Sequence, residues 1–280
     1  MCVMQKCLQL LLEKKTKKKL PEIFDRINSK GTQLSRYQIY AAKWTLSKFK
    51  LDNSKISDDI LNYIKKMYSE RAKQGYVIYE YDPLELDKSR IVNFYDLLFG
   101  FGQMISKDFP YLYNSKINPD TVVSSAFTLI NSCLGCKSSE LDNLLKNYRN
   151  KLKEKEINKF LLSVYEAIKF VDIKILKAVT RFKFNKRSAV SIIHSENQIT
   201  SMIASIFIAK HGEVSSKIKF SKEIENLKLN LEHQNKDWKQ KEKLFKRNMI
   251  KFYVNDIMTS KWKGSGDSFL YQILYNQERY

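Results

Sequence analysis

Residues 155–182 read KEINKFLLSVYEAIKFVDIKILKAVTRF, and this stretch decides the class of the fold. Apolar side chains recur through it every three or four residues, which is the spacing of one face of an α-helix. No glycine or proline interrupts it. We therefore predict one long helix over roughly Lys155–Phe182 whose buried face carries Phe160, Leu161, Val164, Ile168, Val171, Ile175 and Val179.

The same periodicity extends to both sides of this helix, and a Ser or Pro often precedes it where a helix start is expected. The chain has only 8 Gly and 4 Pro, which argues against an all-β protein built from tight turns. Further helices are predicted at Pro21–Ile27, Ser35–Phe49, Ser57–Gln74, Ser89–Lys107, Thr121–Leu134, Glu140–Tyr148, Glu196–Lys210, Ser221–Met258 (broken near His233–Lys236) and Ser268–Gln277. Only Tyr76–Tyr81 has the composition of a strand. The predicted fold is mainly α, a multi-helix bundle-like domain with at most a minor strand.

The charge of the chain indicates a polyanionic partner. Fifty Lys and Arg stand against thirty Asp and Glu, a formal net charge of +20. Nucleic acid is the commonest partner of so basic a protein. A lysine-rich coding bias could raise the charge without any function, and that alternative stays open. The densest cluster supplies the candidates for DNA contact, which are Lys14, Lys15, Lys17, Lys18 and Lys19.

Membrane, secretory and metal-binding roles have little support in the sequence. The most apolar windows, Val122–Leu134 and Ile199–Ala209, are shorter than the ~20 residues of a membrane span and are predicted to be buried helices. No signal peptide is recognisable, so we expect a cytoplasmic protein without disulfides and without a membrane partner. Cys133 and Cys136 form a lone CxxC without a second ligand pair, and we interpret them as small residues ending a buried helix.

Common catalytic signatures are missing. The sequence contains no phosphate-binding glycine loop, no nucleophile elbow and no H-E-x-x-H motif. His211, Asn226 and His233 could be read as an H-N-H nuclease pattern, but the residues between them are predicted to be helical rather than a β-hairpin. We interpret the histidines as surface residues beside helix ends, and His194 as structural or solvated.

The segment from Phe24 to Trp44 could bind an anion. It is predicted to be a short helix, a turn at Asn28–Gly31 and a new helix. Free backbone amides at the second helix start, beside Arg26, Lys30 and Arg36, would suit a phosphate. An ordinary capped helix-turn-helix explains the same residues, and from the residues alone it is the better interpretation.

Residues Ile23 to Ser35 (IFDRINSKGTQLS) resemble the second signature of the GmrS-like family, with Phe24, Asn28, Gly31 and Leu34 at the expected offsets. That family has a ParB/sulfiredoxin-like, nucleotide-hydrolysing core. Its members occur in modification-dependent restriction and anti-phage defence, often joined to an HNH nuclease. The resemblance implies that one wall of a nucleotide or phosphate pocket is formed by Arg26, Asn28, Lys30, Gly31, Thr32 and Arg36.

Two departures from the family change what this resemblance implies. The first signature, D-G-Q-Q-R, and the HNH nuclease portion are both absent. We therefore expect residues 1–50 to be a remnant of the core and residues 51–280 to be the helical domain. The expected function is a non-catalytic portion or subunit of a GmrS-like restriction or defence protein that contacts DNA or a catalytic partner through a basic helical surface. We expect it to have no catalytic residues and no metal site of its own. An NTP and a divalent metal would bind only if a missing core completed the pocket.

The expected partners are DNA and a catalytic or β-core subunit. Self-association is a further expectation, because the apolar residues of 8–12 would lose their cover without the core. Two alternatives stay open. One is a nucleotide-dependent endonuclease subunit that retains activity, and the other is a protein-interaction module that does not bind nucleic acid.

Overall fold

The computed structural model describes residues 40–41, 43–75, 81–110, 112, 119–179, 194–213, 227–264 and 270. The chain divides into two compact units, Met1–Ser47 and Lys48–Tyr280.

The described part of the first unit is the end of a helix. Residues 40, 41, 43 and 44 are helical, and the rings of Tyr40 and Trp44 stack at 4.8 Å with an interplanar angle of 7°. Thr45 Oγ1 donates to Ala41 O at 2.6 Å, and Ser47 N donates to Trp44 O at 3.1 Å, which closes a turn. The prediction of one helix through Phe49 is therefore wrong beyond Trp44.

The second unit is mainly helical, as predicted. Its helices are α4 (Lys55–Lys73), α5 (Pro83–Ser89), α6 (Phe94–Asp108), α7 (Pro119–Cys133), α8 (Leu144–Lys151), α9 (Ile157–Phe170), α10 (Lys177–Val179), α11 (Glu196–His211) and α12 (Trp238–Met258). Short 3₁₀ segments, η1 (Ser138–Asn143) and η2 (Glu154–Glu156), precede α8 and α9, and η3 (Val171–Leu176) follows α9.

Two small antiparallel sheets join parts of the chain that are distant in sequence. Strand β1 (Lys48–Lys50) pairs with β2 (Ile91–Asn93), with Phe49 opposite Val92. Strand β3 (Gly212–Glu213) pairs with β4 (Lys228–Leu229). Strands β1, β2 and β4 lie where the sequence predicted helices, which were Ser35–Phe49, Ser89–Lys107 and Ser221–Met258. The one predicted strand, Tyr76–Tyr81, lies outside the described residues except for Tyr81, which is not in a strand.

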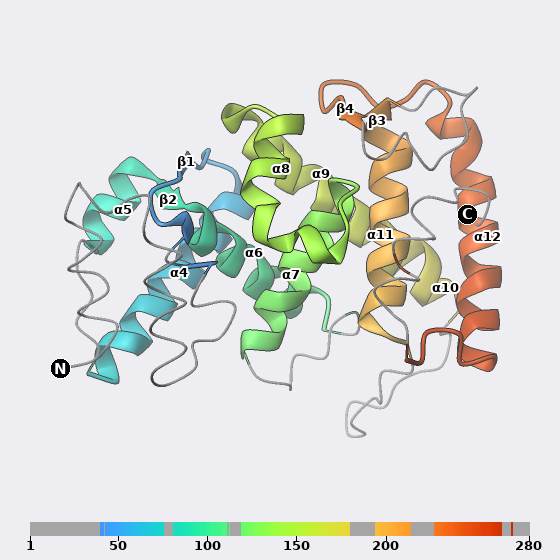
Figure 1. Ribbon diagram of the computed structural model, residues 1–280, viewed down its shortest axis with the longest axis horizontal. Coiled ribbons are helices and arrows are strands. Elements are labelled where there is room, and N and C mark those ends of the chain that lie inside the picture. Colours follow the sequence, from blue (N-terminus) through green and yellow to red (C-terminus); the bar gives the residue numbers. More distant parts are fainter. Residues whose placement is uncertain are drawn as a thin grey trace. The chain divides into compact units, whose positions relative to one another are not determined.

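Successive helices of the second unit pack in series (Figure 1). Helix α4 contacts α6, α6 contacts α7, and α7 contacts α11. Helices α9 and α12 both pack against α11, which is buried along most of its length. The predictions of helices at Ser57–Gln74, Thr121–Leu134 and Glu196–Lys210 are confirmed. Among the described residues, none of the helices has the length and apolar character needed to cross a bilayer.

A chain of aromatic rings runs through the core. Phe49 on β1 contacts Phe94 on α6 at 5.3 Å between ring centroids, and Tyr148 on α8 at 5.8 Å. Tyr148 contacts Phe160 on α9 at 5.7 Å, and Phe160 meets Phe207 on α11 edge to face at 5.4 Å. Aromatic pairs in these geometries add to the hydrophobic stabilisation. These ring contacts thus extend from β1 to α11.

The long helix predicted at 155–182 is interrupted. Ile157–Phe170 is α-helical, but Val171–Leu176 is a π-helix, with bonds from residue i to i+5. The wider turn brings residues five apart together, and Lys177 Nζ forms an ion pair with Asp172 at 2.9 Å. The predicted buried face is otherwise confirmed through Ile175, whereas Val179 is half-buried.

The region before α6 differs from the predicted helix Ser89–Lys107. Asp82 caps α5 by accepting from Leu84 N at 2.8 Å, and Pro83 occupies the first turn, so a separate helix forms there. Arg90 then adopts a left-handed conformation with φ 53°, which ends α5 before β2. Asn93 caps α6 by accepting from Asp96 N at 2.8 Å.

Helices α4 and α6 approach each other closely at Gly100. A Cβ atom there would lie 2.7 Å from Ile60 O and 2.8 Å from Ile60 Cγ2. Only a residue without a side chain fits this contact without movement of the backbone.

Candidate nucleic-acid interface

The residues that the sequence singled out for binding lie outside the described part of the chain. These are the lysine candidates of 14–19 and the pocket-wall residues Arg26, Asn28, Lys30, Gly31, Thr32 and Arg36. They remain predictions. The structure reveals a different basic surface, on helix α12.

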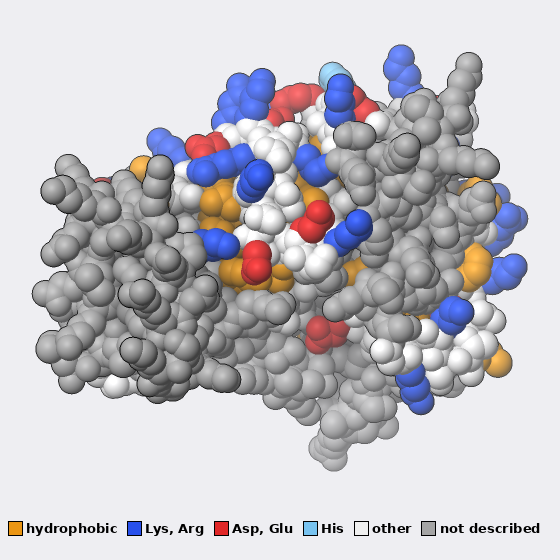
Figure 2. Space-filling model, in the orientation of Figure 1, with side chains coloured by type: hydrophobic (Ala, Val, Ile, Leu, Met, Phe, Trp, Pro, Cys, Tyr) orange, Lys and Arg blue, Asp and Glu red, His pale blue; other side chains and the backbone are white. Residues whose placement is uncertain are grey.

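Helix α12 carries a row of cations that winds gradually along its exposed face. Lys239, Lys243, Arg247 and Lys251 follow one another at intervals of four residues, and all four are exposed. Residues four apart lie above one another on a helix, so this row runs for about 18 Å at 1.5 Å per residue. Figure 2 shows Lys and Arg side chains along the right-hand edge of the molecule, where α12 lies. We call these four residues the cation row.

The cation row has no acidic partner in the part of the chain that the structure describes. None of its four members forms an ion pair with a described Asp or Glu, whereas nearby Lys241 pairs with Asp237 at 3.5 Å. Lys246 is also exposed and lies beside the row. Like charges four residues apart on a helix are destabilising by a few tenths of a kcal/mol per pair. Repulsion within the cation row therefore lowers the stability of the fold locally.

The opposite face of α12 is fixed to the core by buried polar contacts. Gln198 Nε2 on α11 donates to Tyr253 O at 3.2 Å. His194 Nδ1 lies 3.0 Å from Tyr253 Oη, and Trp262 Nε1 donates to Asp256 Oδ2 at 2.8 Å. Ser195 caps α11 by accepting from Gln198 N. The side-chain amide of Gln198 turns to α12 and provides a contact between the two helices.

The residues just before α12 are bound to the end of α11. Asn235 Nδ2 donates to Ala209 O and Gly212 O at 2.8 and 2.9 Å, which satisfies carbonyls at the helix end. Lys210 Nζ lies over the ring of buried Trp238, the first residue of α12, at 5.4 Å. Trp238 also meets Phe170 on α9 at 5.9 Å. The cation row is thus displayed on a helix whose first residue is anchored.

His211 belongs to this anchor and is not a surface histidine. It is buried at the end of α11, its Nδ1 lies 3.2 Å from Asn230 O, and its ring packs on Phe207. Burial lowers the pKa of His211, partly offset by the bond to Asn230 O. His233 is exposed, so His211 and His233 do not share an environment that would suit a nuclease centre.

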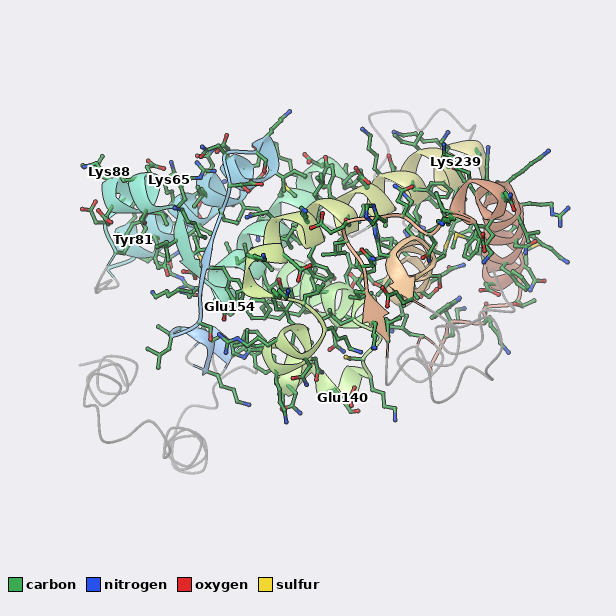
Figure 3. All side chains as sticks on the ribbon, turned by 90° about the horizontal axis from the view of Figure 1, so that it is seen from above. Lys65, Tyr81, Lys88, Glu140, Glu154 and Lys239 are labelled. Atoms are coloured by element: carbon green, nitrogen blue, oxygen red, sulfur yellow. The ribbon has the colours of Figure 1, made fainter. Side chains whose placement is uncertain are left out.

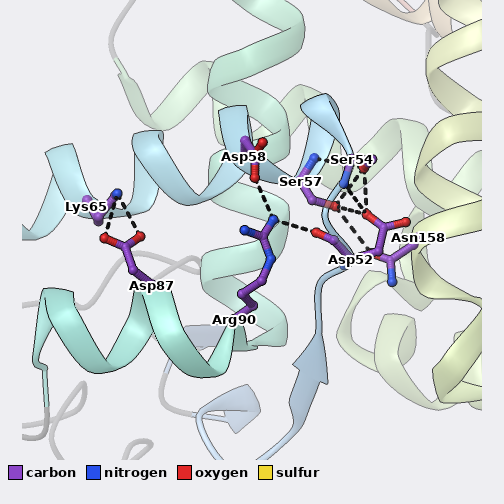
Figure 4. A network of polar contacts seen from close by, with 8 residues as sticks. All are labelled: Asp52, Ser54, Ser57, Asp58, Lys65, Asp87, Arg90 and Asn158. Atoms are coloured by element: carbon purple, nitrogen blue, oxygen red, sulfur yellow. Dashed lines mark hydrogen bonds and ion pairs between the residues drawn. The ribbon is translucent and has the colours of Figure 1, made fainter.

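A second polar cluster, at the end of β1, holds the fold together. The Asp52 carboxylate accepts from Ser54 N at 3.1 Å and from the hydroxyls of Ser54 and Ser57 at 2.6 Å each (Figure 4). Asn158 on α9 accepts from Asp52 N at 3.3 Å and donates to Lys50 O at 3.1 Å. Burial alone would raise the pKa of Asp52, but these hydrogen bonds outweigh it and the pKa is lowered.

Arg90 completes this cluster from the other side. Its Nη2 donates to Asp52 O and to Asp58 Oδ1, the latter at 2.7 Å. All these contacts link strand, loop and helix within the unit. The shallow hollow beside them, lined partly by Ile56, Leu161 and Leu162, is mostly apolar. The cluster is therefore structural.

The buried carboxylate of Asp96 is also structural. Tyr68 Oη donates to it at 2.6 Å, and Asn93 Nδ2 donates to it at 2.7 Å. Burial raises the pKa of Asp96, and burial likewise raises the pKa of Tyr68. These contacts tie α4 to the first turn of α6.

The cysteine pair closes a buried helix end, as interpreted from the sequence. Cys133 and Cys136 are free and buried, and burial raises the pKa of the Cys136 thiol to about 11. Neither thiol is therefore ionised at neutral pH. Within the described ranges, no three side chains of His, Cys, Asp or Glu gather in a way that could hold a metal ion.

The cation row lies within the charged helix predicted over Ser221–Met258, but the sequence did not show which face of that helix is exposed. The same prediction was wrong at Lys228–Leu229, which form β4, and the break extends to Asp237. No family model, curated protein or solved structure is detectably similar to the chain.

Proposed function

We propose that this protein binds DNA through the cation row of α12, by contacts to the phosphate backbone. The observation that carries the proposal is the row itself: four exposed cations spaced four residues apart, without described acidic partners, on a helix anchored by buried contacts. Phosphate oxygens are the natural complement of such a surface.

The geometry favours binding that tolerates different base sequences. Lysine provides three of the four cations, and lysine acts as a point charge rather than as a bidentate reader of base edges. Contacts to phosphates set position and affinity but carry no sequence information. We therefore expect similar affinity for unrelated sequences and a strong dependence on salt concentration.

The test is fluorescence anisotropy with a labelled DNA fragment, at about 50 and about 200 mM salt. The variant Lys243→Gln/Arg247→Gln removes two charges from the middle of the row. We expect its affinity at low salt to fall about tenfold, and the slope of log affinity against log salt to lose about two units.

The matched control is Lys66→Gln/Lys73→Gln, which removes two exposed charges from α4 and leaves the same net charge. We expect it to bind within about twofold of the unchanged protein if the row makes the contacts. Equal losses in both variants would mean that only overall charge matters. No salt-sensitive binding by the unchanged protein would refute DNA binding and favour the protein-interaction module.

We further propose that the chain serves as the non-catalytic part of a GmrS-like restriction or defence protein, as the resemblance of residues 23–35 implies. Nucleotide hydrolysis measured in the same samples tests this role. Turnover that requires a divalent metal would overturn it in favour of an endonuclease subunit that retains activity. Binding without turnover would support it.

A further inference from the structure

The exposed face of α9 and η3 has a pattern that complements itself. Leu162, Glu166, Lys169 and Ile173 are all exposed, the two apolar side chains by 47% and 41%. Their spacings of four, three and four residues place them in one stripe along the helix. We call these residues the α9 stripe.

We propose that two copies of this chain associate through the α9 stripe, with the two helices antiparallel about a two-fold axis. The axis would pass between residues 167 and 168. Leu162 of each copy would then face Ile173 of the other, and Glu166 would face Lys169. Both apolar pairs and both ion pairs are satisfied in this one arrangement, as a two-fold interface requires of a single surface.

The charges on the α9 stripe indicate that its binding partner is a second copy of this chain. Within the described part of the chain, neither Glu166 nor Lys169 has an ion-pair partner, although other exposed lysines such as Lys159 and Lys177 pair with acidic side chains. A parallel arrangement, or a partner of one charge sign, would leave one of the two charges opposed or unpaired. Opposite charges at flanking apolar contacts specify register and orientation in paired helices.

The residues next to the α9 stripe contact other elements, so the stripe itself stays exposed, and a hollow lies at one of its ends. Its neighbours on the helix turn away to other elements, Tyr165 to Asp108 at 3.0 Å and Phe170 to the ring of Trp238. Leu162 also lines the shallow hollow beside Ile56 and Leu161. In the antiparallel arrangement, Ile173 of the second copy lies at this hollow. Its side chain would contact the apolar residues that line it. The stripe is short, so the dimer should be weak and dependent on concentration.

The test is the oligomeric state of the full chain, by sedimentation equilibrium from about 1 to about 200 µM at low salt. We expect a monomer–dimer equilibrium. Glu166→Lys alone, or Lys169→Glu alone, places like charges opposite each other twice per dimer and should weaken it at least about tenfold. The exchanged variant Glu166→Lys/Lys169→Glu restores opposite charges, and its dimer should return to within about threefold of the original.

Lys174→Glu is the control, because it makes the same charge change as Lys169→Glu on an exposed residue outside the stripe. It should leave the dimer constant within about threefold. Circular dichroism of each variant verifies the fold. A monomer at all concentrations would overturn the proposal, as would a dimer unaffected by Glu166→Lys, or an exchanged variant that stays as weak as the single variants.

Discussion

Helices α4 and α12 are both long and rich in lysine, but their charges are placed differently. On α4, Lys65 pairs with Asp87 on α5 at 2.9 Å, Lys66 pairs with Glu70, and Asp58 pairs with Arg90. On α12, the four members of the cation row have no described acidic partner. Figure 3 shows Lys65 and Lys88 at the α4–α5 end of the second unit and Lys239 on the α12 side.

The comparison separates charge that belongs to the fold from charge that is available to a partner. Exposed ion pairs such as Lys65–Asp87 contribute at most about 1 kcal/mol each. They do neutralise the surface locally, so an approaching polyanion meets little net charge there. The members of the cation row form no ion pair with a described acidic residue, so the row presents four charges that are not neutralised locally. Net charge alone could not distinguish these two surfaces.

The largest expected effect lies in the packing of α4. Gly100→Ala places a Cβ atom 2.7 Å from Ile60 O, which forces α4 and α6 apart. We expect a loss of about 2–3 kcal/mol in the free energy of unfolding, measured by urea denaturation. Gln103→Ala, one turn further along α6, is the control and should change stability by less than about 0.5 kcal/mol. A Gly100→Ala variant as stable as the original protein would show that the helices can separate freely.

The second effect concerns the cluster around Asp52. Arg90→Ala removes the donor to Asp52 O and to Asp58, on a side chain that is only 18% exposed. We expect the free energy of unfolding to fall by about 1–2 kcal/mol, with DNA binding by the folded protein unchanged. Lys65→Ala, which breaks a more exposed pair, should cost less than about 1 kcal/mol. Equal costs for the two substitutions would contradict the structural role assigned to the cluster.

The third prediction concerns the contacts of His211 next to the start of α12, and the pH dependence that they give to the stability of the fold. Because the pKa of His211 is lowered in the fold, the unfolded chain binds its proton first as the pH falls. The stabilisation is therefore complete above the ordinary value of 6.5 and is lost as the pH falls through the lowered value. We expect His211 to account for part of the loss of stability as the pH falls below 6.5.

His211→Asn is the matched variant, because its amide can still donate to Asn230 O but does not titrate. Thermal unfolding at several pH values should show a smaller dependence on pH for this variant than for the original protein. An identical dependence in the two proteins would assign the effect to other groups.

The smallest expected effect compares the loss of one lysine charge on α12 with the same loss on α4. Lys243→Gln relieves repulsion from Lys239 and Arg247, so we expect stability to rise by a few tenths of a kcal/mol at low salt. Added salt should remove this gain, because exposed charges are screened. On α4, Lys66→Gln should lower stability slightly or leave it unchanged. A fall in stability for Lys243→Gln would mean that the row supports the fold.

The helical class could be predicted from the sequence because apolar spacing survives in each long segment. The burial of Phe160, Val164 and Ile168 follows directly from it. Strands β1 and β2 could not be predicted in this way. Each is three residues long and depends on a partner over forty positions away, and Phe49 and Ile91 also fit the spacing of neighbouring helices. The π-helix is equally invisible, because its apolar positions match those of an α-helix.

The candidate site was only partly predictable. A basic surface on a helix was expected, and the charge of the chain supports that expectation. Its location required burial information, because only the structure shows that Met249 and Tyr253 face the core while Lys243 and Arg247 face outward. The ion pairs that neutralise α4 also depend on contacts between helices, such as Lys65 with Asp87. Local sequence does not contain that information.

The tryptophans make the candidate interface observable without a label. Of the three in the chain, Trp238 begins α12 and Trp262 follows its end, where each is buried against a fixed neighbour. Indole emission is sensitive to the polarity around the ring, so two of the three natural fluorophores report on the two ends of one helix. With Trp44 replaced by phenylalanine, the remaining emission would follow α12 alone. A ligand that loosens or tightens either end of this helix would then change the intrinsic fluorescence of the protein.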